Sequence, residues 1–373
     1  MKTIRFGVIG GGLMGKEFAS AAARWLHLNF PFARPEIVAI CDVNPQAREW
    51  FTDNIPTCRL STDRYEEILV SKQIDAVYCA VPHDLHAKIY CDIISAGKHL
   101  LGEKPFGIDK AANDAIIKCA VGHPDVLVRS SSEFPFFPGA LAVSRKIAEG
   151  KFGQIISVTA GFHHSSDLDP QKPLNWKRMI EVNGVYGCMG DLGLHVMHLP
   201  LRFGWVPKRI AAQLTNVMTT RPFNGDPAAR CETWDNAAIH TMVEGHGEPF
   251  PMTLETKRIA PGETNTWFIK IEGTASSVAY STKYPKTLLE MDYVPGQPQS
   301  WRQTDLGYAS AYKAITGHIF EFGFSDSLQQ MWCAFLDELV NGRDGMKQPF
   351  YCATPDETAL SHEIMTTALA NQI

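Results

Sequence analysis

The chain has 373 residues, of which 45% are hydrophobic and 20% charged, with a formal net charge of −5 at pH 7. This length exceeds what one core usually holds, so we expect two domains of a soluble globular enzyme. The acidic balance, without any Lys/Arg block, argues against nucleic acid as a partner. No apolar run approaches the roughly 18 residues of a membrane-spanning helix, so a membrane partner is not expected.

The nine cysteines include no C-x-x-C pair, and several lie inside apolar, strand-like runs. Cysteines that are odd in number, scattered and core-like are typical of reduced thiols in the cytoplasm. An Ala-rich run at residues 19–23 follows two early basic residues, but Lys16 and Glu17 interrupt the apolar stretch that a signal peptide would need. We therefore expect a cytoplasmic protein.

Up to about residue 131, short Val/Ile/Ala runs alternate with longer amphipathic stretches, which predicts βαβ units and a doubly wound parallel sheet. Strands are expected near residues 4–9, 36–41, 75–81, 98–102 and 126–130. Helices are expected near residues 14–27, 45–53, 63–71, 84–96 and 109–121. Residues 1–131 are therefore predicted to form a first, α/β domain.

The aromatic, proline-containing stretch 134–138 marks a change of pattern, after which strands dominate. They are expected near residues 154–163, 208–219, 236–245, 250–259, 265–272, 276–281 and 287–292. Helices are expected near residues 139–149, 190–203, 325–342 and 355–371. Residues 132–373 are thus predicted to form a second, α+β domain with a large open, mostly antiparallel sheet.

The first strand runs directly into a G-x-G-x-x-G motif that opens a helix. Gly10 permits the tight turn, Gly12 lets a pyrophosphate approach the backbone, and Gly15 lets the helix pack on its strand. The second strand ends in Asp42, whose carboxylate suits the ribose hydroxyls of NAD and repels the 2′-phosphate of NADP. The alternative is a glycine-rich turn with an ordinary surface aspartate. The residues expected at the pyrophosphate are Gly10, Gly12, Leu13, Met14 and Gly15.

Two further motifs fall at the carboxyl ends of predicted parallel strands, where open α/β sheets bind ligands. The first spans residues 80–86, and the second is Glu103-Lys104-Pro105. Lys104 is expected near the nicotinamide, although an exposed loop lysine before a proline is the commoner fate of a lysine. Glu103 is expected to fix the loop rather than react. The cofactor-binding residues predicted from these motifs are Val81, Pro82, His83, His86, Glu103 and Lys104.

The predicted helix 190–203 carries Asp191, His195 and His198 at positions i, i+4 and i+7, which share one face. Burying three ionisable groups among Leu, Val and Met is costly unless they pair or react. Two histidines and a carboxylate could bind zinc or iron, but hydride transfer to nicotinamide needs no metal, so none is expected. A satisfied core histidine describes His198 well and His195 less well.

Taken in this order, the glycine motif, Glu103-Lys104-Pro105 and Asp191-x-x-x-His195 resemble the glucose–fructose oxidoreductase, inositol dehydrogenase and rhizopine-catabolism (Gfo/Idh/MocA) superfamily across the whole chain. The resemblance implies an NAD-binding Rossmann domain, a second domain whose open sheet often forms oligomer contacts, and oxidation or reduction of a sugar or cyclitol. It also implies that Lys104, Asp191 and His195 line the reacting carbon. The chain departs from the common pattern at His198, where many relatives have Asp, and in residues 174–178.

The chemistry of the three side chains agrees with these implied positions. Removing a hydride from a carbinol carbon requires the hydroxyl proton to leave, and an imidazole with a pKa of about 6.5 is a suitable base, which fits His195. The Lys104 ammonium would stabilise the developing alkoxide and polarise the carbonyl in the reverse direction. Asp191 could either orient the imidazole or hold a neighbouring sugar hydroxyl.

The segment before the predicted helix is expected to decide specificity. The indole of Trp176 can pack on sugar C–H groups, while Lys177 and Arg178 could hold an acidic or phosphorylated substituent. An alternative is a surface loop anchored by one tryptophan. His163 and His164 close a strand expected near the same site, and one of the two must point away. The predicted substrate-binding residues are Lys104, His163, Trp176, Lys177, Arg178, Asp191 and His195.

The sequence therefore predicts an NAD-dependent dehydrogenase of a sugar, sugar derivative or cyclitol. One alternative is a redox-neutral enzyme of the same superfamily, which uses tightly held NAD to cleave a glycoside. A second is a non-catalytic nucleotide-binding sensor, against which the presence of Lys104, Asp191 and His195 argues. We expect a homodimer or homotetramer formed through the sheet of the second domain.

Overall fold

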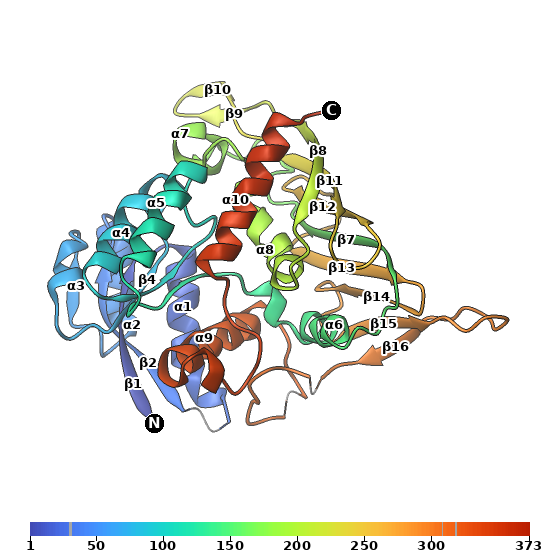
Figure 1. Cartoon of the computed structure of the whole chain (residues 1–373). Helices are drawn as coiled ribbons and strands as arrows, with labels where there is room; N and C mark the ends of the chain where they lie inside the picture. The colour runs from blue at the N-terminus through green and yellow to red at the C-terminus, as the bar shows by residue number, and fades with distance from the viewer. Residues whose placement is uncertain (30–31, 308, 318) are drawn as a thin grey trace. The chain divides into compact units, whose positions relative to one another are not determined.

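The computed structural model describes residues 1–29, 32–307, 309–317 and 319–373 (Figure 1). Contacts divide the chain into two compact units. The first unit consists of Met1–Gly107, Ala111–Phe136 and Ser310–Asp356, and the second of Ile108–Lys110, Phe137–Ala309 and Glu357–Ile373. The boundary expected at residue 131 stays a prediction, but the contacts group Ser310–Asp356, which we expected in the second domain, with the first unit.

The first unit is built on a six-stranded, wholly parallel sheet in the order β3-β2-β1-β4-β5-β6. Its strands are β1 (Lys2–Ile9), β2 (Ala33–Cys41), β3 (Leu60–Thr62), β4 (Ala76–Cys79), β5 (His99–Gly102) and β6 (Val128–Ser130). Its helices are α1 (Leu13–Ala23), α2 (Pro45–Asn54), α3 (Glu66–Val70), α4 (His86–Ser95), α5 (Lys110–Val121) and α9 (Phe324–Asn341). This is the doubly wound Rossmann order, in which ligands bind where the order reverses, between β1 and β4.

The late helix α9 joins this unit because it covers apolar side chains of the sheet and of α1. Trp332 on α9 lies with its ring centroid 5.4 Å from that of Phe6 on β1, and it also packs on Phe18 of α1. All three side chains are buried. Aromatic packing of this kind contributes large apolar burial, which explains why a segment distant in sequence belongs to the first unit.

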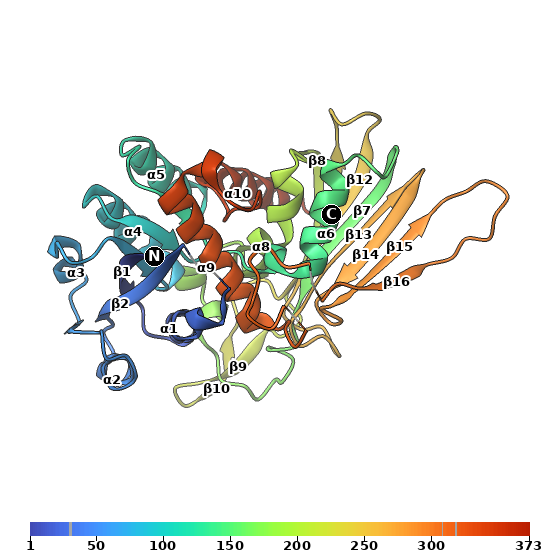
Figure 2. The same cartoon turned by 90° about the horizontal axis from the view of Figure 1, so that it is seen from below.

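The second unit contains an eight-stranded sheet in the order β16-β15-β14-β13-β7-β12-β11-β8 and a separate hairpin of β9 and β10 (Figure 2). All pairs in the large sheet are antiparallel except β7 with β12. Its strands are β7 (Ile155–His163), β8 (Pro207–Thr215), β11 (Asn236–Val243), β12 (Phe250–Lys257), β13 (Thr266–Gly273), β14 (Ser276–Ser281), β15 (Thr287–Asp292) and β16 (Arg302–Asp305). The hairpin is β9 (Thr220–Phe223) with β10 (Asp226–Arg230). The fold class predicted from the sequence is thereby confirmed.

Helices α6 (Pro138–Ala148), α7 (Ile180–Asn183), α8 (Cys188–Arg202) and α10 (Pro355–Ala370) complete the described elements of this unit, and α8 contacts β7 and β12. Short 3-10 helices lie at Arg24–His27, His83–Leu85, Phe134–Phe136, Trp176–Arg178 and Arg343–Gly345. Alternation of buried and more exposed residues along β12 shows that one face of the sheet is packed.

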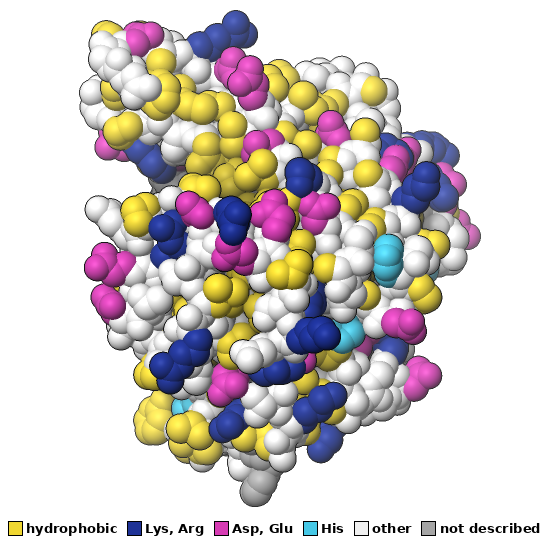
Figure 3. Space-filling view, turned by 90° about the vertical axis from the view of Figure 1, so that its left-hand side faces the viewer, with side chains coloured by type: hydrophobic (Ala, Val, Ile, Leu, Met, Phe, Trp, Pro, Cys, Tyr) yellow, Lys and Arg dark blue, Asp and Glu magenta, His cyan; other side chains and the backbone are white. Residues whose placement is uncertain are grey.

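No helix among the described residues combines the length and apolarity needed to cross a bilayer. On the face drawn in Figure 3, Lys and Arg side chains lie among Asp and Glu side chains. The surface seen there carries both signs of charge, in keeping with the small net charge of the chain.

Candidate active site

The glycine motif forms a turn that needs glycine at two positions and leaves open space at a third. Gly10 has φ +97°, and a Cβ there would lie 2.4 Å from the carbonyl oxygen of Ala80. A Cβ on Gly15 would lie 2.1 Å from the carbonyl oxygen of Gly10. A Cβ on Gly12, directly before α1, would meet no atom within 4 Å. The turn therefore offers room for an anion at the start of α1, as a pyrophosphate requires.

The carboxylate of Asp42 is held beside this turn by main-chain groups. One oxygen accepts the Gly11 N–H at 2.7 Å, and the other accepts the Asn44 N–H at 2.8 Å. The Arg48 guanidinium donates to the Asp42 carbonyl oxygen at 2.6 Å. The acid that we expect at the ribose is thus fixed next to the glycine turn, an arrangement that suits NAD.

The loop after β5 is anchored through Glu103. The Tyr78 hydroxyl donates to its carboxylate at 2.7 Å, and the Tyr90 hydroxyl donates to its carbonyl oxygen at 2.8 Å. This supports the prediction that Glu103 fixes the loop, next to the half-buried Lys104. A second buried carboxyl, Glu133, belongs to none of the sequence motifs. Burial and the neighbouring Glu103 raise the pKa of Glu133 to about 8, while Lys104 opposes the rise.

The two histidines after β4 lie inside the first unit. His83 and His86 are buried, and their rings lie 5.4 Å apart. His86 is 3.0 Å from the carbonyl oxygen of Val81 through Nε2, and its ring stacks on Tyr90. These contacts indicate that His86 stabilises the chain at the end of β4. The cofactor contacts expected of Val81, Pro82, His83 and His86 stay predictions.

The second unit carries Asp191 and His195 on α8, a helix whose residues 188–201 are all buried. Asp191 lies in the first turn, where the helix dipole favours a negative charge. The indole N–H of Trp267 on β13 donates to the carbonyl oxygen of His195 at 2.8 Å. The ring of Phe162 on β7 meets the His195 ring edge-on at 5.4 Å. The sheet thus fixes the helix that presents both candidate residues.

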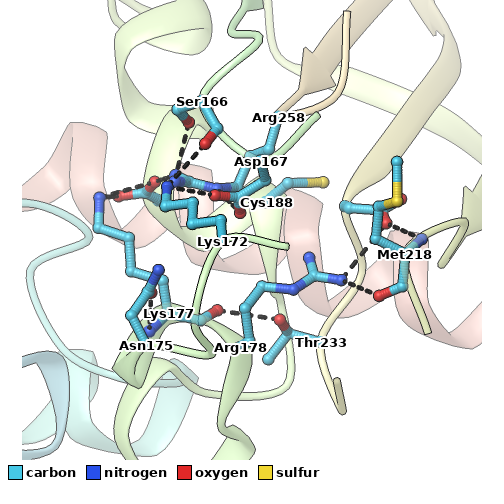
Figure 4. A network of polar contacts seen from close by, with 12 residues as sticks. Ser166, Asp167, Lys172, Asn175, Lys177, Arg178, Cys188, Met218, Thr233 and Arg258 are labelled. Carbon is cyan, nitrogen blue, oxygen red and sulfur yellow. Dashed lines mark hydrogen bonds and ion pairs between the residues drawn. The ribbon is translucent and has the colours of Figure 1, made fainter. Parts of the chain in front are cut away.

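A chain of ion pairs includes the buried Asp191 carboxylate. Figure 4 labels its other members, Asp167, Lys172, Lys177 and Arg258. Lys177 donates to both of its oxygens, at 2.9 Å and 3.0 Å. Arg258, directly after β12, binds one of the same oxygens through Nη1 and donates through Nε to Asp167 at 2.9 Å. Lys172 completes the chain by donating to Asp167 at 2.8 Å. We call these five residues the Asp191 cluster.

The electrostatics of the Asp191 cluster favour the charged forms of Asp167 and Arg258. Burial alone would raise the pKa of Asp167, but Arg258 and Lys172 hold that pKa well below its ordinary value. Burial alone would lower the pKa of Arg258, but Asp191 and Asp167 raise it. A carboxylate bound by two cations is a poor proton acceptor, so the cluster favours a holding role for Asp191.

Arg178 does not join this cluster. Its side chain is fully buried, and it pairs at 3.3 Å with Asp235, which is also fully buried. The same guanidinium donates to Asn216 at 2.7 Å and to the Met218 carbonyl oxygen at 3.0 Å. The partners of Arg178 thus lie in the interior, and the structure does not bring Arg178 together with Asp191. Lys177 does contact Asp191, and the half-buried Trp176 lies beside Lys177.

His163 lies on the face of the sheet opposite to the one that α8 covers. Its Nε2 is 3.0 Å from Glu255, and its ring meets Phe268 edge-on. His163, with Lys257, lowers the pKa of Glu255 to about 2. The rings of Phe162 and His164 lie 4.7 Å apart, on the face of the sheet where Phe162 contacts His195. The structure thus does not bring His163 together with the other predicted substrate residues of this unit.

His198 is completely buried on α8, with Nε2 2.8 Å from the Arg202 guanidinium and 3.9 Å from Glu357. This environment agrees with the core histidine that the sequence suggested. Among the described residues, no group of three or more His, Cys, Asp or Glu side chains is placed to hold a metal ion.

The first unit is a dinucleotide-binding Rossmann domain. Its sheet order, its open glycine turn and the fixed Asp42 after β2 define this class. Residues 4–129 match the family model described as "Oxidoreductase family, NAD-binding Rossmann fold" (GFO_IDH_MocA). In these residues the chain is similar to the Gfo/Idh/MocA oxidoreductases, and the matched fold is one that binds NAD.

Two curated relatives extend the comparison beyond the first unit. Levoglucosan dehydrogenase of Pseudarthrobacter phenanthrenivorans is 26% identical over 305 residues, which cover 75% of this chain and 74% of the relative. Inositol 2-dehydrogenase of Rhizobium meliloti is 29% identical over 171 residues, 46% of this chain and 47% of the relative. A solved levoglucosan dehydrogenase in complex with NADH and levoglucosan shares the fold, with a TM-score of 0.85, 20% identity and coverage of 99% of this chain and 97% of that one.

Proposed function

We propose that this protein is an NAD-dependent dehydrogenase that transfers a hydride between nicotinamide and a carbinol carbon of a sugar, sugar derivative or cyclitol. The observation that carries the proposal is Asp191, held by Lys177 and Arg258 one helical turn before His195. A buried helix that presents a carboxylate and an imidazole together in an NAD-binding oxidoreductase is suited to hold and deprotonate a hydroxyl group.

Each side chain has one proposed task. His195 takes the hydroxyl proton through its imidazole and returns it in the reverse direction. Lys104 donates a hydrogen bond to the same oxygen and stabilises the developing alkoxide. Asp191, held by Lys177 and Arg258, orients the substrate or the imidazole rather than accepting a proton. NAD supplies the hydride acceptor when it is bound.

The names of the relatives support this substrate class. One is a levoglucosan dehydrogenase and another an inositol 2-dehydrogenase, and both names describe the oxidation of a polyhydroxylated ring. The proposal extends that chemistry to this chain, for which the family resemblance implies that Asp191 and His195 line the reacting carbon.

Absorbance of NADH tests the proposal directly. Purified protein with NAD would be given a panel of inositols, aldoses, sugar acids and glycosides. Steady NADH formation with one class is the expected result and names the substrate. Silence across the panel, with NAD binding shown separately by calorimetry, would overturn it. Release of an aglycone without net NADH would instead select the redox-neutral glycoside reaction.

We also propose that the protein is a cytoplasmic homodimer or homotetramer that associates through the large sheet of the second unit. A large open sheet face is suited to self-association, because two copies can pack the same face against each other. Light scattering coupled to size-exclusion chromatography measures the mass in solution, and a monomer at all concentrations would contradict this assembly.

A further inference from the structure

The Asp191 cluster contains three cations and two carboxylates, which are joined by ion pairs. The two carboxylates are the buried members, because the side chain of Asp167 is 0% exposed and that of Asp191 is 2% exposed. The two lysines are the members that reach solvent, with Lys172 35% and Lys177 30% exposed. A ligand that approaches the cluster therefore meets ammonium groups.

A fourth cation, Arg221 on β9, contacts the main chain of two residues of the cluster. Its side chain is buried, and in the part of the chain that the structure describes it hydrogen-bonds to main-chain carbonyl oxygens rather than to a carboxylate. These oxygens belong to Asp167, Asp169 and Lys172. The loop that carries Lys172 is thus wrapped around an arginine.

The position of Lys177 makes it the cation best placed to meet a substrate. Its ammonium binds the candidate site residue Asp191 and lies 5.5 Å from the centre of the Trp176 ring. An indole face that packs on a sugar ring would bring the ring's substituents close to this ammonium. Arg178, the other cation that the sequence suggested, is fully buried against Asp235 and is excluded from this role.

We propose that the substrate carries an anionic group, a carboxylate or a phosphate, and that Lys177 binds it while Arg258 keeps Asp191 in place from the buried side. The inference rests on the proposed function and narrows its substrate class from sugars in general to sugar acids or sugar phosphates. A lysine ammonium is a suitable partner for either anion, because it acts as a point charge with three hydrogen-bond donors.

Matched substrate pairs test this inference. Glucose would be compared with glucuronate and with glucose 6-phosphate, and galactose with galacturonate, by kcat/KM for NADH formation. At least one anionic member should exceed its neutral partner by roughly tenfold or more, the usual effect of a hydrogen bond to a charged group. The acid and phosphate arms distinguish the two anions. A neutral member that equals or exceeds its anionic partners in every pair would overturn the inference.

The variant Lys177→Gln keeps the length and a donor of the side chain but removes the charge. It should lower kcat/KM for the anionic substrate roughly tenfold to hundredfold, and for its neutral partner clearly less. Lys208→Gln, at an exposed lysine on β8 outside the cluster, is the matched control and should leave both values unchanged. Equal losses for anionic and neutral substrates in Lys177→Gln would contradict a role for its charge in recognition.

Calorimetry separates failure of this inference from failure of the proposed function. Binding of the same pairs to the NADH-loaded protein needs no turnover. If no sugar yields NADH but an anionic sugar still binds more tightly through Lys177, the dehydrogenase proposal fails and the inference stands. If NADH forms but the anionic and neutral sugars bind equally tightly, the inference fails and the dehydrogenase proposal stands.

Discussion

The nucleotide turn of the first unit and the Asp191 cluster of the second manage negative charge in opposite ways. The turn offers space and main-chain N–H groups: a Cβ would collide with the backbone at Gly10 and Gly15, and Gly12 leaves the space before α1 open. The cluster surrounds a buried carboxylate with the side-chain cations Lys177 and Arg258. A site of the first kind is sensitive to added atoms, whereas one of the second kind is sensitive to lost charges.

The largest effect is expected at His195, on the helix that the cluster holds in place. His195→Ala removes the proposed acid–base group and should reduce turnover by about 10²- to 10⁴-fold, the usual share of such catalysis. Steady-state kinetics with saturating substrate measures the loss, and circular dichroism checks that the variant is folded. Unchanged turnover would mean that another group is the base.

Removal of a cluster cation should be costly to stability. Arg258→Met leaves Asp167 and Asp191 buried with one partner fewer each, so we expect a loss of about 3–5 kcal/mol in the free energy of unfolding. Lys172→Met is the matched control, because Lys172 is partly exposed and its loss should cost about 1 kcal/mol or less. Urea denaturation measures both changes, and equal losses would show that burial does not separate the two cations.

The cluster also shows where sequence patterns stop being informative. The glycine turn was predictable because strand, glycines and helix are contiguous, and Asp42 follows the next predicted strand at its expected end. Arg258 could not be assigned, because its contact with Asp191 exists only once β12 and α8 pack together. Arg178 is next to Lys177 in sequence, yet in the fold Arg178 pairs with Asp235 and Lys177 with Asp191, so adjacency in sequence does not predict their partners.

The same limit applies to secondary structure and to Glu133. The three residues of β3, Leu60–Thr62, are too few to show a strand period, so this strand was missed. Helix α8, by contrast, has a long apolar run, and the prediction of 190–203 lies close to its actual bounds, Cys188–Arg202. Glu133 follows three serines and carries no motif; only burial beside Glu103 and Lys104 distinguishes it.

Glu133 tests whether the first unit also depends on buried charge. Its pKa of about 8 in the folded protein lies above the ordinary value of about 4.3, so folding favours the protonated form. The free energy of unfolding should therefore fall as pH rises from about 4.3 to 8 and change little from this source outside that range. Glu133→Gln cannot ionise, so between pH 6 and 8 the wild type should lose about 2 kcal/mol more than the variant. Urea denaturation at both pH values measures the difference, and parallel curves would show that Glu133 does not titrate there.

The smallest effect is expected from adding a single methyl group to the nucleotide turn. Gly12 has an ordinary φ of −69°, and a Cβ there would meet no atom of the protein, so Gly12→Ala should alter the free energy of unfolding by only about 0.5 kcal/mol. The same methyl group would occupy the space expected for the pyrophosphate, so the Kd for NAD should rise roughly tenfold, which corresponds to about 1.4 kcal/mol. Gly15→Ala is the contrasting variant, because its Cβ would collide with the Gly10 carbonyl oxygen and should destabilise the fold itself. Calorimetric NAD binding and urea denaturation on both variants separate the two effects. If Gly12→Ala bound NAD as the wild type does, the open space before α1 would not be where the cofactor's phosphates lie, because a site defined by absent atoms must respond when an atom is added.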